Sequence, residues 1–348
     1  MIRRLLVGLG AAAVPAALAR VAVGRGVDRL VNAPRVAPDE SGLGPALDAL
    51  GGEVVRLRSR DGLRLSARWL PATGEPGWRP DPYEAILLLH GWSGSVAPDV
   101  VEFAPFLRRV AAVLALDFRG HGESDEAETT FGMREVEDVA GALSWLGERG
   151  IRRVALFGTS MGGITALASA VVLGDAGLVQ TDVDVDAPAA VDEAPRPAIV
   201  GIVAESVPAE LPTAIAGRMR GPLRGVLARL IFGAAARRLN GDPRATEPIR
   251  VIGLLGVPLL LIHGDADHSV PRTDAKRLAA AGGPNVSHWV VPGAPHSEAH
   301  RIEPREYEQK VVSFLRTAFA GSRDSRAILP ASRTRKPASG RARRVVND

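Results

Sequence analysis

A serine between two glycines is the first feature of this sequence with catalytic potential. Gly158-Thr159-Ser160-Met161-Gly162 follows an apolar run that ends at residue 157 and precedes a helical pattern. Glycines on both sides of a serine allow the sharp strand-to-helix turn that presents a nucleophilic hydroxyl. The short string alone is weak support, so its position between a predicted strand and a predicted helix carries the interpretation. We expect Ser160 to be a nucleophile.

A serine hydroxyl is a weak nucleophile at neutral pH, so it needs a histidine base and a carboxylate that orients the base. Of the seven histidines, His296 lies in the segment GAPHSE, five residues past the end of a predicted strand. Loops at the carboxyl ends of parallel strands form the sites of α/β proteins, which favours His296 as the base. His300 is the alternative. For His90, His121 and His263, which lie in glycine-containing turns, a structural hydrogen bond is the expected role.

Two aspartates could orient the base. Asp265 and Asp267 both lie on the loop that follows the apolar run 258–262. A carboxylate on this loop can reach an imidazole on the neighbouring loop, and the residues themselves leave both choices open.

Acyl transfer also requires two backbone N–H donors for the negative charge that develops on the carbonyl oxygen. One should come from Met161, directly after the nucleophile, at a helix N-terminus whose dipole favours negative charge. The segment HGWSG at 90–94 follows another apolar run. We expect the second donor there, from the amide of Trp92.

Short apolar runs alternate with helical patterns along most of the chain, and these elements must position the site. Two alternating runs, 54–59 and 63–70, are joined at Asp-Gly, and the continuous runs that follow are 85–89, 111–116, 153–157, 198–204, 258–262 and 286–291. Asp-Gly between alternating runs is typical of a hairpin, and continuous apolar runs are typical of strands buried on both faces. The order predicts an α/β fold, with a mostly parallel sheet, N-terminal antiparallel strands and helices on both faces.

Composition divides the chain around this domain. Arg3 and Arg4 precede fifteen uncharged residues, so we interpret 1–29 as a targeting or anchor segment, with an extension on a soluble cytoplasmic protein as the alternative. Residues 53–321 form the predicted domain. The remaining assignments are a linker at 30–52, an acidic surface insertion at 175–196, a small helical cap at 207–250 and a disordered basic tail at 322–348.

The cap segment allows two interpretations. Leu223, Leu227, Leu230 and Ile231 share one helical face, which would pack against the sheet or form a lid over the site.

Composition excludes several classes of protein. The chain of 348 residues is 46% hydrophobic and 24% charged, as in globular proteins, and it has no cysteine for disulfides or thiolate chemistry. Its net charge of +4 arises at the ends, where residues 1–29 hold five arginines and one aspartate and residues 322–348 hold eight basic and two acidic residues. The intervening residues are net acidic. We therefore expect no nucleic-acid partner, and the residues suggest no metal and no organic cofactor.

Four blocks of sequence resemble the α/β-hydrolase superfamily, in particular its compact serine-hydrolase branch, which includes esterases and prolyl-oligopeptidase-like catalytic domains. The blocks are LLLHGWSGS at 87–95, LALDFRGHGES at 114–124, ALFGTSMGG at 155–163, and LLIHGDADHSVP at 260–271 with VVPGAPHSE at 290–298. The family pattern HGxxDxxVP favours Asp267 over Asp265 as the acid. It also implies a structural turn at Asp117 and His121. Pro295 replaces a glycine common in the family, which should stiffen the loop without changing the chemistry.

The resemblance implies a serine hydrolase that cleaves small acyl esters: Ser160 attacks, His296 transfers the proton and Asp267 orients His296. A serine peptidase or an acyltransferase on the same fold is the alternative. From another class, the alternative is a membrane-tethered interaction protein without catalysis. The predicted partners are a small-molecule acyl substrate and, through the N-terminal segment, a membrane; the oligomeric state stays open. The same segment predicts a membrane-associated or exported location.

Overall fold

The computed structural model describes residues 19–36, 42–92, 94–174 and 196–327, with side chains as far as residue 323. An eight-stranded sheet forms its centre, in the order β1-β2-β4-β3-β5-β6-β7-β8. Its strands are β1 (Glu53–Arg58), β2 (Arg64–Leu70), β3 (Glu84–Leu89), β4 (Ala112–Leu116), β5 (Arg153–Thr159), β6 (Ala198–Glu205), β7 (Leu259–Gly264) and β8 (Val286–Val291). β1 pairs with β2 and β2 with β4 in antiparallel fashion, and the other pairs are parallel. The predicted fold class is confirmed.

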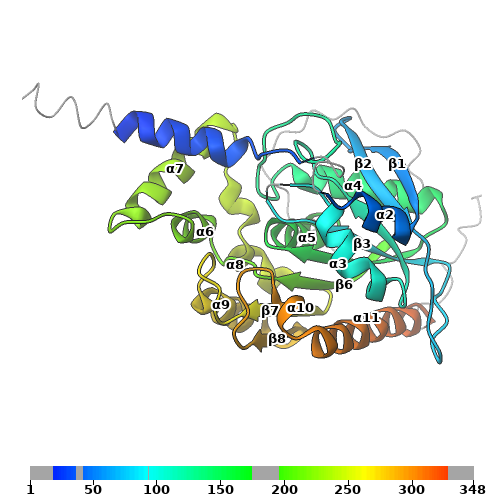
Figure 1. Ribbon diagram of the computed structural model, residues 1–348. Coiled ribbons are helices and arrows are strands. Elements are labelled where there is room, and N and C mark those ends of the chain that lie inside the picture. Colours follow the sequence, from blue (N-terminus) through cyan, green and yellow to red (C-terminus); the bar gives the residue numbers. More distant parts are fainter. Residues whose placement is uncertain (1–18, 37–41, 93, 175–195, 328–348) are drawn as a thin grey trace, which may run out of the picture.

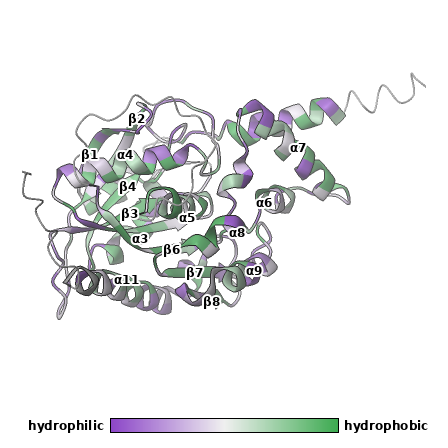
Figure 2. Ribbon diagram, turned by 180° about the vertical axis from the view of Figure 1, so that it is seen from behind, coloured by the Kyte–Doolittle hydropathy of each residue, from purple (hydrophilic) through white to green (hydrophobic). Residues whose placement is uncertain are grey.

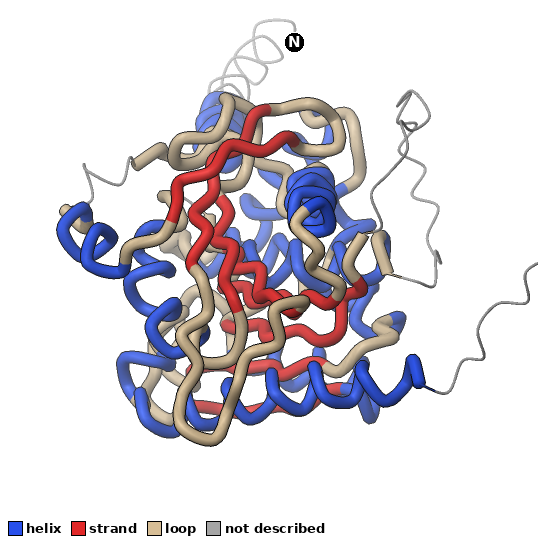
Figure 3. The backbone as a smooth tube through the Cα atoms, turned by 90° about the vertical axis from the view of Figure 1, so that its right-hand side faces the viewer, coloured by secondary structure: helices blue, strands red, loops and turns tan. Residues whose placement is uncertain are grey.

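Helices cover both faces of this twisted sheet (Figure 3). They are α2 (Gly44–Leu50), α3 (Ala97–Leu107), α4 (Glu135–Glu148), α5 (Met161–Val172), α6 (Leu211–Gly217), α7 (Arg224–Arg238), α8 (Pro248–Val251), α9 (Arg272–Gly282), α10 (Ala299–Ile302) and α11 (Pro304–Ala327). Residues 19–31 form a further helix. Side chains of α4, α5 and α9 build the apolar cluster on one face of the sheet, and those of α2, α3 and α11 build the cluster on the other.

The continuous apolar runs form strands because both faces of the sheet are covered. All six residues of β3 are buried. Successive side chains point to opposite faces, so Leu87 and Leu89 join the cluster with α4 and α5, whereas Ile86 and Leu88 join the cluster with α3 and α11. The carboxyl ends of the parallel strands consequently lie along one edge, where their loops meet.

The segment between β6 and β7 leaves the body of the molecule and places α6 and α7 beside the helix of residues 19–31 (Figure 1). Ile231 of α7 is buried against Val27 and Val31 of that helix. Leu223 and Leu230 are 71% and 53% exposed. The apolar residues of this segment therefore do not share one face packed against the sheet, because α7 lies away from the sheet and has the N-terminal helix as its neighbour.

The N-terminal region also differs from the expected leader and linker. Residues 1–18 lie outside the described part, but residues 19–31 are a helix that contacts α7. Within the predicted linker, Val31 and Leu47 of α2 are buried, at 0% and 2% exposure, so this stretch belongs to the folded unit. Among the described residues, no helix combines the length and the apolar character needed to cross a membrane.

At the other end, α11 continues to Ala327, past the predicted start of the tail at residue 322. The guanidinium of Arg323 donates to both carboxylate oxygens of the buried Glu84 at 2.8 and 2.7 Å, which holds this last turn against the body. The predicted insertion at 175–196, except its last residue, and the tail from residue 328 lie outside the described residues.

Candidate active site

Ser160 occupies the turn between β5 and α5 with a strained backbone. Its φ of 50° and ψ of −111° lie where residues other than glycine are rare. Its amide donates to the carbonyl of Glu205 at 2.8 Å, which ties the turn to the end of β6. A Cβ on Gly162 would overlap the carbonyl of Leu89, and a Cβ on Gly158 would overlap Gly162 itself. Both glycines are therefore required for this turn.

His296 connects Ser160 to Asp267. Its Nε2 lies 3.1 Å from the Ser160 Oγ, and its Nδ1 lies 2.7 Å from Oδ2 of Asp267. Because a carboxylate only accepts hydrogen bonds, Nδ1 carries the proton and Nε2 is free to accept from the hydroxyl. The structure thus brings these three predicted residues into one hydrogen-bonded row.

The Asp267 carboxylate is fixed by its own loop. It is 7% exposed, and its Oδ1 accepts hydrogen bonds from the amides of Ser269 and Val270, both at 2.8 Å. Burial by itself would raise the pKa of Asp267, but the hydrogen bonds from His296 and from the Val270 amide lower it below its usual value. The carboxylate therefore stays ionised beside the imidazole.

The two alternative residues have other partners. Oδ1 of Asp265 accepts from the amide of Gly293 at 2.6 Å. His300 faces two carboxylates, Glu102 at 3.3 Å and Glu308 at 3.5 Å. Burial would lower the pKa of His300, but these carboxylates raise it. The structure does not bring Asp265 or His300 into hydrogen-bond contact with Ser160.

Several polar residues of the resembling blocks have structural partners. His90 donates from Nδ1 to its neighbouring carbonyl at 2.7 Å and accepts from the Phe118 amide at 3.1 Å, and burial together with the nearby His121 lowers its pKa to about 3. His121 donates to a backbone carbonyl within its own turn at 2.9 Å. Oδ1 of Asp117 accepts from the Val96 amide at 2.7 Å.

The two predicted oxyanion donors lie beside Ser160. Trp92 and Met161 line the same cavity as Ser160. Met161 is the first residue of α5, so its amide cannot bond within the helix. In the described ranges, neither backbone amide donates a hydrogen bond to the protein. The Trp92 indole Nε1 donates elsewhere, to the carbonyl of Leu30 at 3.0 Å.

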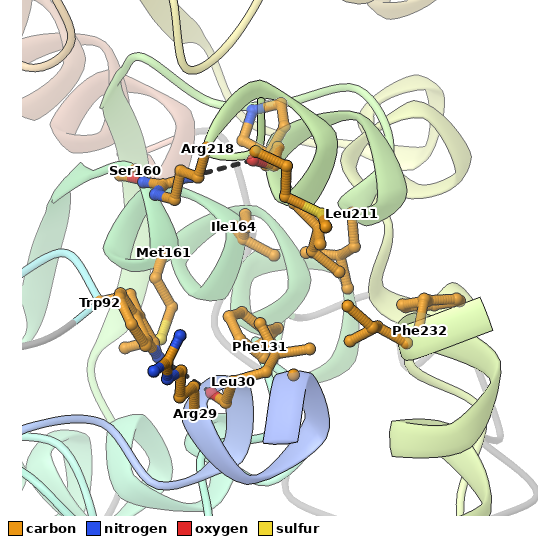
Figure 4. A pocket seen from close by; sticks show the side chains of 16 residues that line it. Arg29, Leu30, Trp92, Phe131, Ser160, Met161, Ile164, Leu211, Arg218 and Phe232 are labelled. Atoms are coloured by element: carbon orange, nitrogen blue, oxygen red, sulfur yellow. Dashed lines mark hydrogen bonds between the residues drawn. The ribbon is translucent and has the colours of Figure 1, made fainter. Parts of the chain in front are cut away.

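An apolar cavity of about 260 Å³ opens at Ser160 (Figure 4). The body of the domain, α6, α7 and the helix of residues 19–31 all contribute to its wall. The large apolar side chains of the wall include Leu30, Trp92, Phe131, Ile164, Ile215 and Phe232. The sequence analysis missed Leu30, which it assigned to the start of the linker at 30–52, and it missed Phe131, for which we find no sequence signal.

Arg218 is a second feature that the sequence analysis did not find. It follows α6, and its Nη2 lies 3.4 Å from the Nε2 of His296. Burial lowers the pKa of Arg218 from its ordinary value. Its Nη1 bonds to the Ala214 carbonyl at 3.3 Å, and no carboxylate within the described residues lies within 4 Å of it. A guanidinium therefore lies beside the His296 imidazole. Arg218 lines the same cavity as Ser160 (Figure 4).

A metal would need a group of at least three suitable side chains. In the part of the chain that the structure describes, no such group of histidine, aspartate and glutamate residues exists. The site consists of a hydroxyl, an imidazole, a carboxylate and two backbone amides, which together suffice for nucleophilic acyl transfer.

Known proteins resemble this chain in sequence and in fold. The uncharacterized protein YfhR of Escherichia coli is 26% identical over 298 residues, covering 82% of this chain and 89% of YfhR. The uncharacterized protein Rv2307c of Mycobacterium tuberculosis is 27% identical over 275 residues, covering 78% and 82%.

Among solved structures, the Pyrococcus furiosus esterase Pf2001 has a TM-score of 0.57 at 23% identity, covering 82% of this chain and 97% of its own. A puromycin hydrolase has a TM-score of 0.56 at 19% identity, and the match spans 77% of this chain but 39% of that protein. Both likenesses establish the fold. Residues 86–309, more than half of the chain, match the model of the alpha/beta hydrolase family. The chain therefore belongs to the alpha/beta hydrolase family.

Proposed function

We propose that this protein is a serine hydrolase of acyl esters and that Ser160, His296 and Asp267 are its catalytic triad. The observation that carries the proposal is the hydrogen-bonded row from the Ser160 hydroxyl through the imidazole to the buried carboxylate, at 3.1 and 2.7 Å. With Nδ1 protonated toward the carboxylate, the imidazole can take the hydroxyl proton at Nε2, as a row of nucleophile, base and orienting acid requires.

The reaction has two acyl-transfer steps. Ser160 Oγ attacks the ester carbonyl carbon while its proton passes to Nε2 of His296. The oxygen of the tetrahedral intermediate accepts hydrogen bonds from the amides of Trp92 and Met161. The intermediate releases the alcohol, which takes the proton from His296, and leaves an acyl group on Ser160. Water then attacks this acyl-enzyme with His296 again as base, and the carboxylic acid leaves.

The cavity indicates the kind of acyl group. Its wall is mostly apolar, and its volume of about 260 Å³ exceeds what an acetyl group fills. Burial of each further methylene stabilises the bound ester by about 0.8 kcal/mol until the cavity is full. We therefore expect kcat/KM to rise from acetate to an intermediate acyl length and then to fall.

A peptidase and an acyltransferase use the same acyl-enzyme and differ in the leaving group or in the second nucleophile. No observation on the described residues favours either of them over ester hydrolysis. A membrane-associated or exported location through residues 1–29 stays a prediction from the sequence.

Two measurements on the purified protein test the proposal. Wild type should hydrolyse p-nitrophenyl esters and react covalently with a fluorophosphonate probe, and Ser160→Ala should lose at least about 10³-fold in kcat and all labelling. Ser287→Ala, at an exposed serine on β8, is the matched control and should behave as wild type. Labelling of Ser160→Ala, or more than a tenth of wild-type turnover by it, would exclude Ser160 as the nucleophile.

A further inference from the structure

We propose that the cap docks on an anionic lipid surface through one face, formed by the exposed residues of segment 220–237. We refer to this face as the cap face. It holds three of the eight large apolar side chains that are exposed in the described part of the chain: Leu223 (71%), Val226 (57%) and Leu230 (53%). Such a concentration on one small surface marks a place for an apolar partner.

The exposed residues of α7 are separate from those that hold the cap together. Leu223, Val226 and Leu230 follow one another at spacings of three and four residues and so lie on one side of the helix. The buried residues of α7 are Ala228, Ile231, Phe232 and Ala235. The helix thus has a packed side and an exposed apolar side that no part of the described chain covers.

Charge identifies the partner. Segment 211–241 contains six arginines and no acidic residue, and helix 19–31 contains three arginines and one aspartate, Asp28. Asp28 pairs with Arg238, which also bonds to Glu128. In the described part of the chain, none of the other eight arginines has a carboxylate within 4 Å. Arg29 and Arg218 line the cavity, and the exposed arginines of the cap face are Arg220, Arg224, Arg229 and Arg237.

An anionic bilayer matches both the exposed apolar side chains and the unpaired arginines of the cap face. Leu223, Val226 and Leu230 lie exposed among the arginines of α7, so the same surface offers apolar side chains to the interface and positive charge to anionic headgroups. Each arginine near an anionic leaflet is attracted to it, whereas a second copy that used the same face would bring the unpaired arginines of both copies together. The body of the molecule is net acidic, so the cap face would turn toward the lipid and the body away from it.

The position of the cavity agrees with this orientation. Arg29 and Leu30 of the N-terminal helix and Arg218 and Phe232 of the cap line the cavity that ends at Ser160. In Figures 1 and 2 the same helices project from the body beyond the sheet. An ester held in the bilayer could therefore enter the cavity along the elements that contact the lipid.

Site-specific fluorescence can test docking on the full chain, because the protein has no cysteine of its own. Leu230→Cys labelled with the polarity-sensitive dye NBD reports the cap face, and Thr317→Cys on the exposed side of α11 is the control. With phosphatidylcholine–phosphatidylglycerol vesicles, the label at 230 should shift to shorter wavelength and brighten several-fold, while the label at 317 should not change. Pure phosphatidylcholine should have little effect, and high salt should reverse the change.

A charge variant adds a matched comparison. In vesicle co-sedimentation, Arg229→Ser should weaken binding roughly fivefold, the loss expected for one arginine at an anionic surface. Arg305→Ser, at an exposed arginine of α11, should bind as wild type.

An unchanged label at residue 230 on anionic vesicles would overturn the proposal, even if the protein sediments with them, since binding would then arise from another segment. A label that changes without vesicles would overturn it in favour of contact between copies. Lipid docking rests on the proposed hydrolase function only for the identity of the substrate, and fluorophosphonate labelling of Ser160 in the same samples reports the proposed chemistry independently. Failure of lipid docking can therefore be distinguished from failure of the serine hydrolase proposal.

Discussion

Replacement of Asp267 by asparagine conserves shape and hydrogen-bonding atoms, yet the structure indicates that it should remove nearly all activity. Oδ1 of Asp267 accepts two amides, those of Ser269 and Val270, both at 2.8 Å. The asparagine oxygen must occupy this position, because the flipped amide would direct its NH2 group at two N–H donors and leave them unsatisfied, at about 1–3 kcal/mol each. The NH2 group must then face His296.

This orientation selects the wrong tautomer of the base. The NH2 group donates to Nδ1 of His296, which must give up its proton, and the proton moves to Nε2. Nε2 lies 3.1 Å from the Ser160 hydroxyl and can then no longer accept its proton. The same change in a serine protease lowers kcat about 10⁴-fold, which corresponds to about 5.5 kcal/mol in the activation free energy.

Asp265→Asn is the matched control two residues away. Its Oδ1 accepts only the Gly293 amide, at 2.6 Å, a bond that an asparagine oxygen retains. We expect this variant within about threefold of wild type, the range of a surface substitution. The assay is kcat/KM on p-nitrophenyl butyrate, with thermal unfolding followed by circular dichroism to show that both variants fold. Turnover by Asp267→Asn within tenfold of wild type, or greater damage by Asp265→Asn, would refute this reasoning.

Three further predictions concern stability and the cavity. Burial raises the pKa of Asp99, whose carboxylate accepts from the Thr159 hydroxyl at 3.2 Å, to about 7, so the folded state binds the proton more tightly than the unfolded chain. Titration of Asp99 should therefore lower the free energy of unfolding by up to about 4 kcal/mol as pH rises from about 4 to about 7. In urea titrations, Asp99→Asn should remove this contribution and leave that of Asp138, whose pKa burial also raises to about 7; an equal pH dependence of both proteins would contradict this. Arg323→Ala should lower the free energy of unfolding by about 1–2 kcal/mol, because Glu84 is 1% exposed and loses one of its arginine partners; an unchanged melting temperature would argue against this. Val31→Asp places a charge at a position of 0% exposure beneath α7. We expect this variant to reduce kcat/KM for apolar esters about tenfold and to speed proteolysis of the N-terminal helix. Wild-type values of both would mean that this helix does not shape the cavity.

Structural features that depend on residues close together in the chain were predictable from the sequence. The turn at Ser160 depends on glycines two residues away on each side, and the buried strands appear as continuous apolar runs, so the local sequence suffices for both. His296 and the loop that holds Asp265 and Asp267 were assigned because parallel strands bring their carboxyl-end loops to one edge of the sheet. Their hydrogen-bond contacts agree with that topology.

The choice between Asp265 and Asp267 illustrates where local reasoning ends. Both residues lie on the same loop, and the residues alone allowed either, although the family resemblance favoured Asp267. In the structure, their carboxylates point to different partners, the Gly293 amide and the His296 imidazole. Side-chain direction in an irregular loop follows from the backbone torsions of that loop, which the spacing of residue types does not reveal.

What the sequence determined by itself is the α/β order of elements, the nucleophile turn and the residues available to serve it. Only the tertiary structure decided that residues 19–31 pack on α7, some two hundred residues away, and that Leu30 lines the cavity. From the sequence, residues 1–29 were interpreted as a targeting or anchor segment, and nothing in the pattern of residues 19–29 indicated a helix packed on α7. Periodicity in the sequence shows which side of a helix is apolar. Which element then buries that side depends on the free energies of all competing contacts, and these contacts form only when the chain folds.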